Sequence, residues 1–248
     1  RWQWNQKVRL FKKPIQILSP SNWMTNCVKK SNLMKDWPVK TIPHPIDISK
    51  WSPLDKYVSR KQLNLPQKKK LIIFGAIGGV KDSRKGFKLL NLALKHLKKL
   101  SSCEDINLIV FGGGDRNVYS QPDLKIHHFD HINDDKILQE LYSAADVMIV
   151  PSILETFGQT ALESLACGTP VVTFKGTGTS DIVEHKKTGY LAEALNEKDL
   201  ANGINWVLEN SSEGILQTES RKRAKFFFSD EIIVKRFYNI YNNLLSVN

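Results

Sequence analysis

The chain has 248 residues, of which 41% are hydrophobic and 25% are charged, with 36 Lys and Arg against 25 Asp and Glu. This composition is typical of a globular protein with one large or two small domains. The sequence contains no run of about 18 apolar residues, so we expect no transmembrane helix. The net charge of +11 favours anionic partners, but no nucleic-acid-binding motif occurs, so we expect no nucleic acid.

Apolar runs and helical periodicity alternate along the chain. Strands are predicted at residues 15–18, 70–75, 106–111, 125–129, 147–150 and 171–174. Helices are predicted at residues 22–31, 87–100, 137–145, 156–167, 198–208 and 230–245. Residues 1–13 have no predicted element, residues 38–53 contain four prolines and predict an irregular connection, and residues 188–189 predict a turn. Strands that alternate with helices indicate an α/β fold with a doubly wound parallel sheet.

Residues 146–174 form the most informative unit of the chain. An apolar strand ends at Pro151, a helix follows, and Gly168 supplies a stop signal before the next strand. In open α/β sheets, ligands bind beyond the carboxyl ends of the strands, where the free N–H groups of helix N-termini attract phosphate. We therefore predict an anion site at the first turn of this helix. That turn is predicted to contain Thr156, Phe157 and Gly158.

Polar side chains form a stripe along the same helix. Thr156, Thr160 and Glu163 are spaced four and three residues apart, and Glu155 precedes the first turn. Carboxylates accept hydrogen bonds from sugar hydroxyls, so a stripe next to an anion site suggests a ligand with both phosphate and hydroxyl groups. The spacing alone leaves another interpretation open, in which Glu163 is solvated and Glu155 is an acid favoured by the helix dipole.

Two cations precede the helix predicted at residues 87–100. Arg84 can hold a diphosphate with its forked guanidinium group, and Lys85 can do so as a point charge. Taken alone, this segment is more typical of a solvated loop. Gly112 to Gly114 follow a strand and fit either a phosphate cradle or a plain tight turn.

The basic clusters and the cysteines of the chain are not predicted to form a functional site. The basic clusters, including Arg221 to Arg223, are interpreted as solvated faces. Cys27, Cys103 and Cys167 are scattered without the spacing of a metal site, and Cys167 is predicted to be a buried thiol. Unpaired cysteines fit a reducing cytosol best.

Several motifs occur in order along the chain. The largest lies within residues 151–172 and contains Glu155 and Glu163, which are separated by seven residues. The others are Pro20-Ser21-Asn22-Trp23, Ile42-Pro43-His44-Pro45-Ile46-Asp47, Ser83-Arg84-Lys85-Gly86-Phe87, Phe111-Gly112-Gly113-Gly114 and Thr188-Gly189-Tyr190. This set resembles the landmarks of the family 4 retaining glycosyltransferases, which have the GT-B fold. The resemblance covers almost the whole chain and is closest to bacterial enzymes of capsule, exopolysaccharide or lipopolysaccharide assembly.

The resemblance implies transfer of a hexosyl group from a nucleotide diphosphate sugar to a glycan or lipid-linked acceptor, with retention of configuration. It assigns Glu163 to the ribose hydroxyls, Glu155 to the donor sugar as the catalytic residue, and Arg84 with Lys85 to the diphosphate. It completes the donor site with Thr156, Phe157, Gly158 and Thr160. The family's usual arginine after the preceding strand is not evident here, because Ala76 follows Gly75. No Asp-x-Asp motif occurs, so we expect no metal and no other cofactor.

The resemblance also implies two Rossmann-like domains with the donor bound between them. Residues 1–40 then form a remnant of the N-terminal acceptor domain, residues 41–229 the C-terminal nucleotide-sugar-binding domain, and residues 230–248 a helix that crosses back. Since the chain starts at Arg1, we expect a fragment that is inactive in transfer on its own. The implied location is cytoplasmic, with peripheral contact at the inner face of an acidic membrane.

Two rival functions remain open at this point. A sugar-nucleotide epimerase of the same fold would release a free epimerised sugar instead of a glycoside. A non-catalytic nucleotide-binding module would bind the donor without consuming it.

Overall fold

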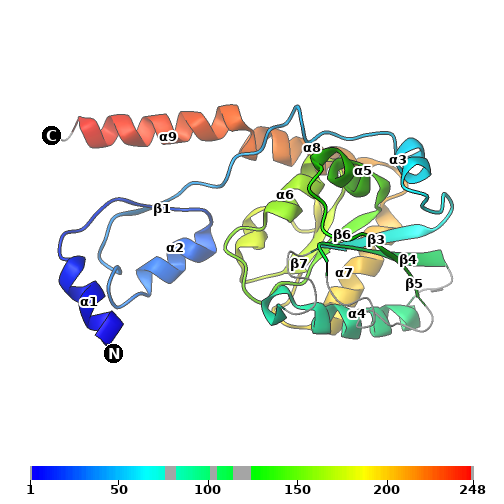
Figure 1. Cartoon of the computed structure of the whole chain (residues 1–248), viewed down its shortest axis with the longest axis horizontal. Helices are drawn as coiled ribbons and strands as arrows, with labels where there is room; N and C mark the ends of the chain where they lie inside the picture. Colours follow the sequence, from blue (N-terminus) through cyan, green and yellow to red (C-terminus); the bar gives the residue numbers. More distant parts are fainter. Residues whose placement is uncertain (1, 76–81, 101–104, 114–123, 247–248) are drawn as a thin grey trace.

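The computed structural model describes residues 2–75, 82–100, 105–113 and 124–246. Its larger part is a six-stranded parallel sheet with the order β5-β4-β3-β6-β7-β8, covered by helices on both faces (Figure 1). The strands are β3 (Lys70–Gly75), β4 (Ile106–Phe111), β5 (Lys125–His128), β6 (Val147–Val150), β7 (Val171–Phe174) and β8 (Gly189–Ala192). The α/β, doubly wound parallel fold predicted from the sequence is thereby confirmed.

The central strands are apolar throughout because both of their faces are buried. Leu71 and Ile73 of β3 pack on one face with helices α5 (Asp135–Ala144), α6 (Gln159–Ala166) and α8 (Ile215–Phe228). Ile72 and Phe74 point to the opposite face, where they meet α4 (Phe87–Leu100) and α7 (Glu197–Asn210). The period of two along each strand therefore divides the core into two layers.

The chain reverses its direction of winding between β3 and β6. From β3 it proceeds outward through β4 to β5, and it then returns to pair β6 with the other side of β3. Such a reversal opens a crevice beyond the carboxyl ends of the two strands, and this is the usual place for a ligand in open α/β sheets.

The smaller part of the structure combines the two ends of the described chain. It contains α1 (Trp2–Leu10), β1 (Ile17–Ser19), α2 (Asn22–Lys29) and β2 (Val39–Thr41), with β1 and β2 paired in parallel. Helix α9 (Asp230–Leu245) runs alongside these elements (Figure 1). A small apolar cluster joins them, formed by Leu18, Ile42, Ile233, Phe237 and Ile240.

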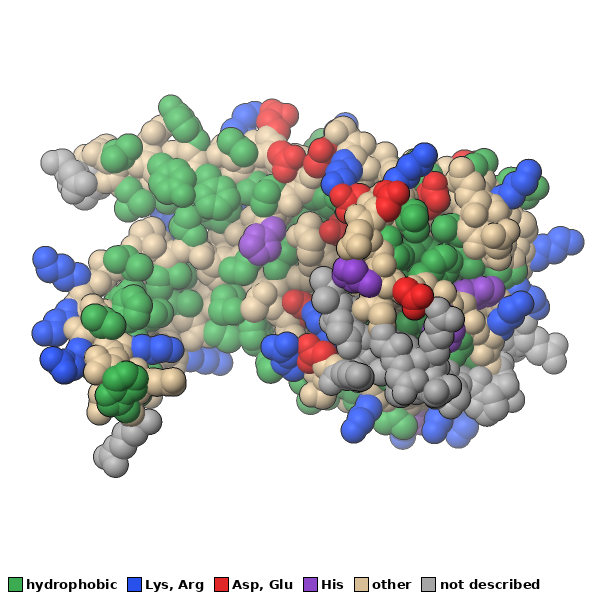
Figure 2. Space-filling model, in the orientation of Figure 1, with side chains coloured by type: hydrophobic (Ala, Val, Ile, Leu, Met, Phe, Trp, Pro, Cys, Tyr) green, Lys and Arg blue, Asp and Glu red, His purple; other side chains and the backbone are tan. Residues whose placement is uncertain are grey.

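Exposed apolar side chains gather over this smaller part. Figure 2 shows hydrophobic side chains on α9 and on the N-terminal elements below it. The most exposed of them include Trp2, Leu10, Val234, Tyr238 and Leu245. Helix α1 has no buried residue, so its position depends little on packing against the rest of the described chain.

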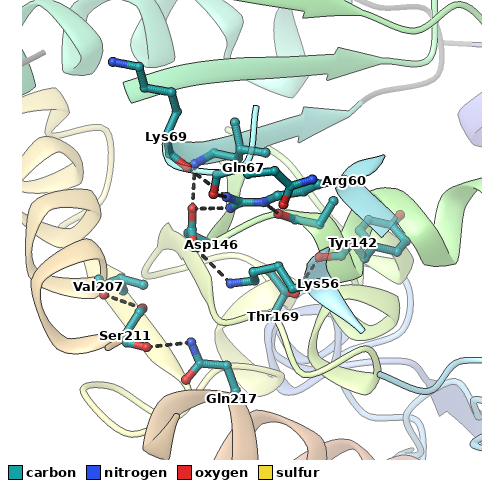
Figure 3. A network of polar contacts seen from close by, with 12 residues as sticks. Lys56, Arg60, Gln67, Lys69, Tyr142, Asp146, Thr169, Val207, Ser211 and Gln217 are labelled. Atoms are coloured by element: carbon teal, nitrogen blue, oxygen red, sulfur yellow. Dashed lines mark hydrogen bonds and ion pairs between the residues drawn. The ribbon is translucent and has the colours of Figure 1, made fainter. Parts of the chain in front are cut away.

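A buried acid ties the amino-terminal edge of the sheet together. Asp146, directly before β6, accepts hydrogen bonds from Arg60 Nη2 at 2.9 Å and from the backbone N–H of Leu71 at 2.6 Å, and it pairs with Lys56 (Figure 3). Arg60 also donates to the carbonyl oxygens of Ala144, Gln67 and Lys69. Helix α3 (Lys56–Gln62), which carries both cations, is fixed to the sheet through this network.

Most of the predicted elements are confirmed within one or two residues, and five elements were missed. They are α1, β2, α3, β8 and α8. Residues 1–13 therefore do contain structure, the Pro38–Pro53 connection contains a short strand, and the predicted turn at 188–189 leads directly into β8. Cys167 is buried, as predicted.

The interpretation of the basic cluster at 221–225 as a solvated face was wrong for its two arginines, whereas Lys222 and Lys225 are exposed. Arg221 donates to the carbonyl oxygens of Trp51, Ala166 and Ile48, and Arg223 donates to that of Asp181. Both guanidinium groups lie partly buried and connect α8 to neighbouring loops, since a planar donor fork can satisfy several carbonyl groups at once. Among the described residues, none of the helices is long and apolar enough to cross a membrane.

Candidate functional site

Two loops meet at the crevice beyond β3 and β6. The 3-10 turn Ser83–Lys85 belongs to the connection after β3, and residues 151–158 form the connection after β6. The N–H of Ile153 donates to the carbonyl oxygen of Arg84 at 2.7 Å. Gly86 has a positive φ of 72°, and a Cβ there would lie 1.7 Å from the carbonyl oxygen of Pro151. A glycine is required at this position because only glycine combines this φ with so close a backbone approach.

An ion pair bridges the two loops. Lys85 Nζ lies 2.7 Å from Glu155 Oε2, with 30% and 17% of the respective side chains exposed. Ser152 Oγ lies 3.5 Å from the same carboxylate oxygen. The structure therefore brings together two of the residues predicted for the site, one cation and one acid, although they are 70 residues apart in the sequence.

Arg84 lies differently from Lys85. Its guanidinium group forks onto Asp82, with Nε 3.0 Å from Oδ1 and Nη2 2.9 Å from Oδ2, and 68% of the Arg84 side chain is exposed. The hydrogen bonds from Arg84 lower the pKa of the Asp82 carboxyl below its ordinary value. In this arrangement the guanidinium group is engaged by its neighbour and does not join the Lys85–Glu155 pair.

Helix α6 begins later than the sequence predicted. Its first residue is Gln159, and Gly158 is the N-cap with a φ of 103°. Thr156, Phe157 and Gly158 are therefore a loop instead of the first helical turn. The Phe157 side chain is buried, with its ring 5.0 Å from that of His44 in an edge-on contact. Of these three residues, Thr156 is exposed at the crevice, and a Cβ on Gly158 would clash with Thr179 at 2.3 Å.

Thr160 and Glu163 face a second part of the site. With Gln159 they line one side of a cavity of about 210 Å³ whose other walls come from the carboxyl end of β4, the segment after β5, and α5. The remaining lining residues are Phe111, Gly112, His131, Ile132, Leu138 and Tyr142. This largely apolar cavity with a carboxylate on its wall fits a flat ring that carries a hydroxylated group.

The Glu163 carboxylate is strongly desolvated in this cavity. Burial raises the pKa of Glu163 to about 7, and nearby Asp135 adds to the increase. Hydrogen bonds from Tyr142 and Gln159 and the charge of Lys50 act in the opposite direction. Tyr142 Oη donates to Glu163 Oε2 at 2.9 Å. Glu163 consequently changes its charge near neutral pH, which a solvated surface acid would not do.

The sequence did not reveal every residue of this site. Tyr142 and Leu138 contribute walls of the cavity without belonging to any of the quoted motifs. The N-terminal segment also reaches the site: Ser21 Oγ donates to the carbonyl oxygen of Thr156 at 2.6 Å, and the N–H of Asn22 donates to Asp181 at 2.5 Å. The Pro20–Trp23 motif indicated that this segment matters, but it did not predict that the segment contacts Thr156 and Asp181. Gly114, predicted within the glycine-rich loop, and Cys103 lie outside the described residues.

Comparison with known proteins gives this geometry a context. Residues 55–225 match the family described as glycosyl transferases group 1. A protein of Methanocaldococcus jannaschii, named as an uncharacterized glycosyltransferase, is 28% identical over 195 residues, which are 75% of this chain and 48% of the relative. The chain thus spans about half the length of the curated relatives it matches.

Solved structures of the same fold include one with a bound nucleotide sugar. Sucrose-phosphate synthase from Thermosynechococcus elongatus superposes with a TM-score of 0.78 and 24% identity, covering 98% of this chain and 61% of that one. Anabaena HepE in complex with UDP-glucose gives a TM-score of 0.73 and 20% identity, covering 98% and 67%. At this level of identity the likeness concerns the fold alone.

Proposed function

Because the chain belongs to the glycosyl transferases group 1 family and has the GT-B type of fold, we propose that it is the donor-binding part of a retaining glycosyltransferase. The donor is a nucleotide diphosphate sugar, and the group transferred is a hexosyl unit. One observation carries the proposal: a cation–carboxylate pair and a carboxylate-walled apolar cavity lie along a single loop and helix, residues 155–163.

The chemical parts of a nucleotide sugar fit these features in order. The base occupies the cavity between Phe111, Ile132 and Leu138, and Glu163 accepts hydrogen bonds from the ribose hydroxyls. Lys85 binds the diphosphate, and Glu155 faces the hexose next to it. The charge that develops on the leaving diphosphate is stabilised by Lys85 and by the N-terminus of α6. Thr156, Gly158 and Thr160 line this path, whereas Phe157 supports it from the core.

The role of Arg84 requires a change of partner. Its guanidinium group is held by Asp82 in this structure, so it joins the diphosphate only after releasing that carboxylate. The exposed position of Arg84 leaves room for such a rotation. We therefore assign Lys85 the larger share of phosphate binding.

The acceptor is a glycan or lipid-linked sugar in this proposal, and contact with an acidic membrane accompanies it. The segment before Asp36, the first acid of the chain, contains eight Lys and Arg residues. Such a segment is attracted to anionic lipid headgroups. Salt-sensitive binding to vesicles that contain anionic lipid, and none to neutral vesicles, is the corresponding test.

Calorimetry with a panel of nucleotides tests the donor site directly. The panel consists of UDP, GDP, ADP and CDP, each paired with its glucose conjugate. We expect the chain to bind one of these four pairs more tightly than the other three. Glu163→Gln should weaken that nucleoside diphosphate by about 5- to 10-fold, because a charged acceptor becomes a neutral one. We also expect residues 1–248 to form no glycoside alone, since catalysis needs both substrates held together. Failure of all four nucleotides to bind would contradict the proposal.

Glu155→Gln provides a test of the ion pair. Glu155 and a bound diphosphate compete for Lys85, so removing the carboxylate charge should raise the affinity for the nucleoside diphosphate by about 3- to 10-fold. The additional affinity that the attached sugar gives over the nucleoside diphosphate should fall, because Glu155 faces the hexose. Calorimetry with the nucleoside diphosphate and with its sugar conjugate gives both values.

The matched control for this variant is Glu193→Gln. Glu193 also pairs with a lysine, Lys175, but on the surface near β8. The control should bind both ligands like the unmodified chain. An unchanged diphosphate affinity in Glu155→Gln would mean that the ion pair does not oppose phosphate binding.

A further inference from the structure

Tyr142 is a buried residue that reaches the candidate site from the core. Its side chain is fully buried, with its ring centroid 5.9 Å from that of Trp51 and 5.9 Å from that of Phe111. Its backbone carbonyl oxygen accepts a hydrogen bond from Thr169 Oγ1 at 2.6 Å (Figure 3). Ring packing and the backbone bond together fix the position of the phenol oxygen.

That oxygen is directed at one atom of Glu163. The phenol hydroxyl donates to Oε2 at 2.9 Å, and both side chains line the apolar cavity. A carboxylate has two oxygens with several lone pairs. Tyr142 engages Oε2 from the core side, so a fully buried side chain holds one oxygen of the carboxylate in place.

We propose that Tyr142 is a positioning residue for the nucleotide site, whose hydroxyl holds Glu163 so that its carboxylate presents acceptors to the ribose hydroxyls. The inference rests on the proposed function, since it presumes a nucleotide in the cavity. It assigns the role to a tyrosine on α5, 21 residues before the acid that it orients.

The electrostatics of the pair give this role a measurable signature. The pKa of the Tyr142 phenol lies well above its ordinary value because the group is buried, so the hydroxyl keeps its proton at neutral pH. Its hydrogen bond lowers the pKa of Glu163, against the larger effect of burial. Asp135 on α5, Lys50 in the loop before α3, and Gln159 on α6 also face Glu163. They remain in place when the Tyr142 hydroxyl is removed.

Tyr142→Phe removes this hydroxyl alone. The pKa of Glu163 should then rise further, and more of the acid should be protonated near pH 7, where it is a poorer acceptor for the ribose hydroxyls. We expect the tightest-binding nucleoside diphosphate of the panel to bind about 3- to 10-fold more weakly at pH 7. Because ionised Glu163 is restored at higher pH, the part of the loss caused by protonation should be recovered by pH 9, and the part caused by the lost orientation of the carboxylate should remain.

Calorimetry from pH 6 to pH 9 measures this shift. The ratio of the affinities of the variant and the unmodified chain is taken at each pH, because the ratio cancels the ionisation of the ligand phosphate, whose second pKa is about 6. Tyr190→Phe is the matched control: its hydroxyl also meets a carboxylate, Asp199 Oδ1 at 3.0 Å, but beside β8. Its ratio should stay near one at every pH.

The possible outcomes separate this inference from the proposed function. A loss in Tyr142→Phe that is just as large in the Glu163→Gln background would indicate a general packing defect and overturn the positioning role. Unchanged binding in Tyr142→Phe, with weakened binding in Glu163→Gln, would overturn the role of Tyr142 and keep the proposed site. Unchanged binding in both variants would remove the ribose assignment itself. In a Glu163→Gln background, Tyr142→Phe should have little further effect, since coupled residues are not additive.

Discussion

Lys85→Ala is expected to weaken binding of the nucleoside diphosphate by roughly 10- to 100-fold and to leave binding of the nucleoside almost unchanged. Lys85 lies where the connections after β3 and β6 meet, with its ammonium group half-buried against Glu155. A charge-assisted contact with phosphate in such a setting contributes about 1.5–3 kcal/mol. A nucleoside has no phosphate, so its affinity should not change in this variant. Calorimetry with both ligands measures the difference.

Two controls make this result specific to phosphate. Lys88→Ala removes an exposed positive charge from α4, three residues further along, and should change the affinity by less than about 2-fold. Lys85→Ala also leaves Glu155 without its cation, and that acid would repel phosphate. The double variant Lys85→Ala/Glu155→Gln removes this effect and should still bind more weakly than Glu155→Gln alone. An equal loss for nucleoside and nucleoside diphosphate would exclude a phosphate-binding role.

Arg60→Met is expected to lower the free energy of unfolding by about 3–5 kcal/mol, because it leaves a buried carboxylate without its main partner. Arg60 and Asp146 have side chains only 5% and 10% exposed. Four backbone carbonyl groups lose their donor at the same time. Urea denaturation at equilibrium gives the value, provided that the unfolding slope is unchanged.

Lys56→Met provides the comparison within the same network. Lys56 also pairs with Asp146, but 40% of its side chain is exposed, so we expect a loss below about 1 kcal/mol. Both variants should retain their nucleotide affinity under folding conditions, because Asp146 lies at the amino-terminal edge of the sheet and the crevice lies at the opposite edge. A loss below 1 kcal/mol in Arg60→Met would contradict the structural role assigned to the pair.

The elements that the sequence predicted best have a strong local signal. Strand β3 and helix α4 were predicted with the bounds that the structure has, because one is a continuous apolar run and the other repeats its apolar residues on one face. Helix α8 was missed because its buried residues form a single narrow row at intervals of four, between many cations. That row consists of Leu216, Ser220, Ala224 and Phe228.

The other missed elements depend on tertiary contacts. Strand β8 has four residues and begins at Gly189, which has a φ of 148° and packs against the backbone of Val171. Helix α3 presents no apolar face, and its buried residues are Ser59 and Arg60. Its position is determined by Asp146, which lies more than 80 residues away in the sequence. No pattern within seven residues can contain such information.

The same distinction applies to the candidate site. The spacing of Glu155, Thr160 and Glu163 is local, so the sequence could indicate a polar stripe. The partners of these residues are distant, and the pairing of Lys85 with Glu155 and of Tyr142 with Glu163 emerged only from the fold. The local preference of Arg84 for Asp82, two residues before it, could have been suspected from the sequence.

The packing of α9 against β1 and β2 has a consequence for how the chain folds during synthesis. Ile42 and Leu18 pack with Ile233, Phe237 and Ile240, which the ribosome adds roughly 190 residues later. At about 5–20 residues per second, the early segment waits on the order of ten seconds or more for its cover. Throughout that interval its apolar surface is available to chaperones, and the six-stranded sheet can complete its own core first.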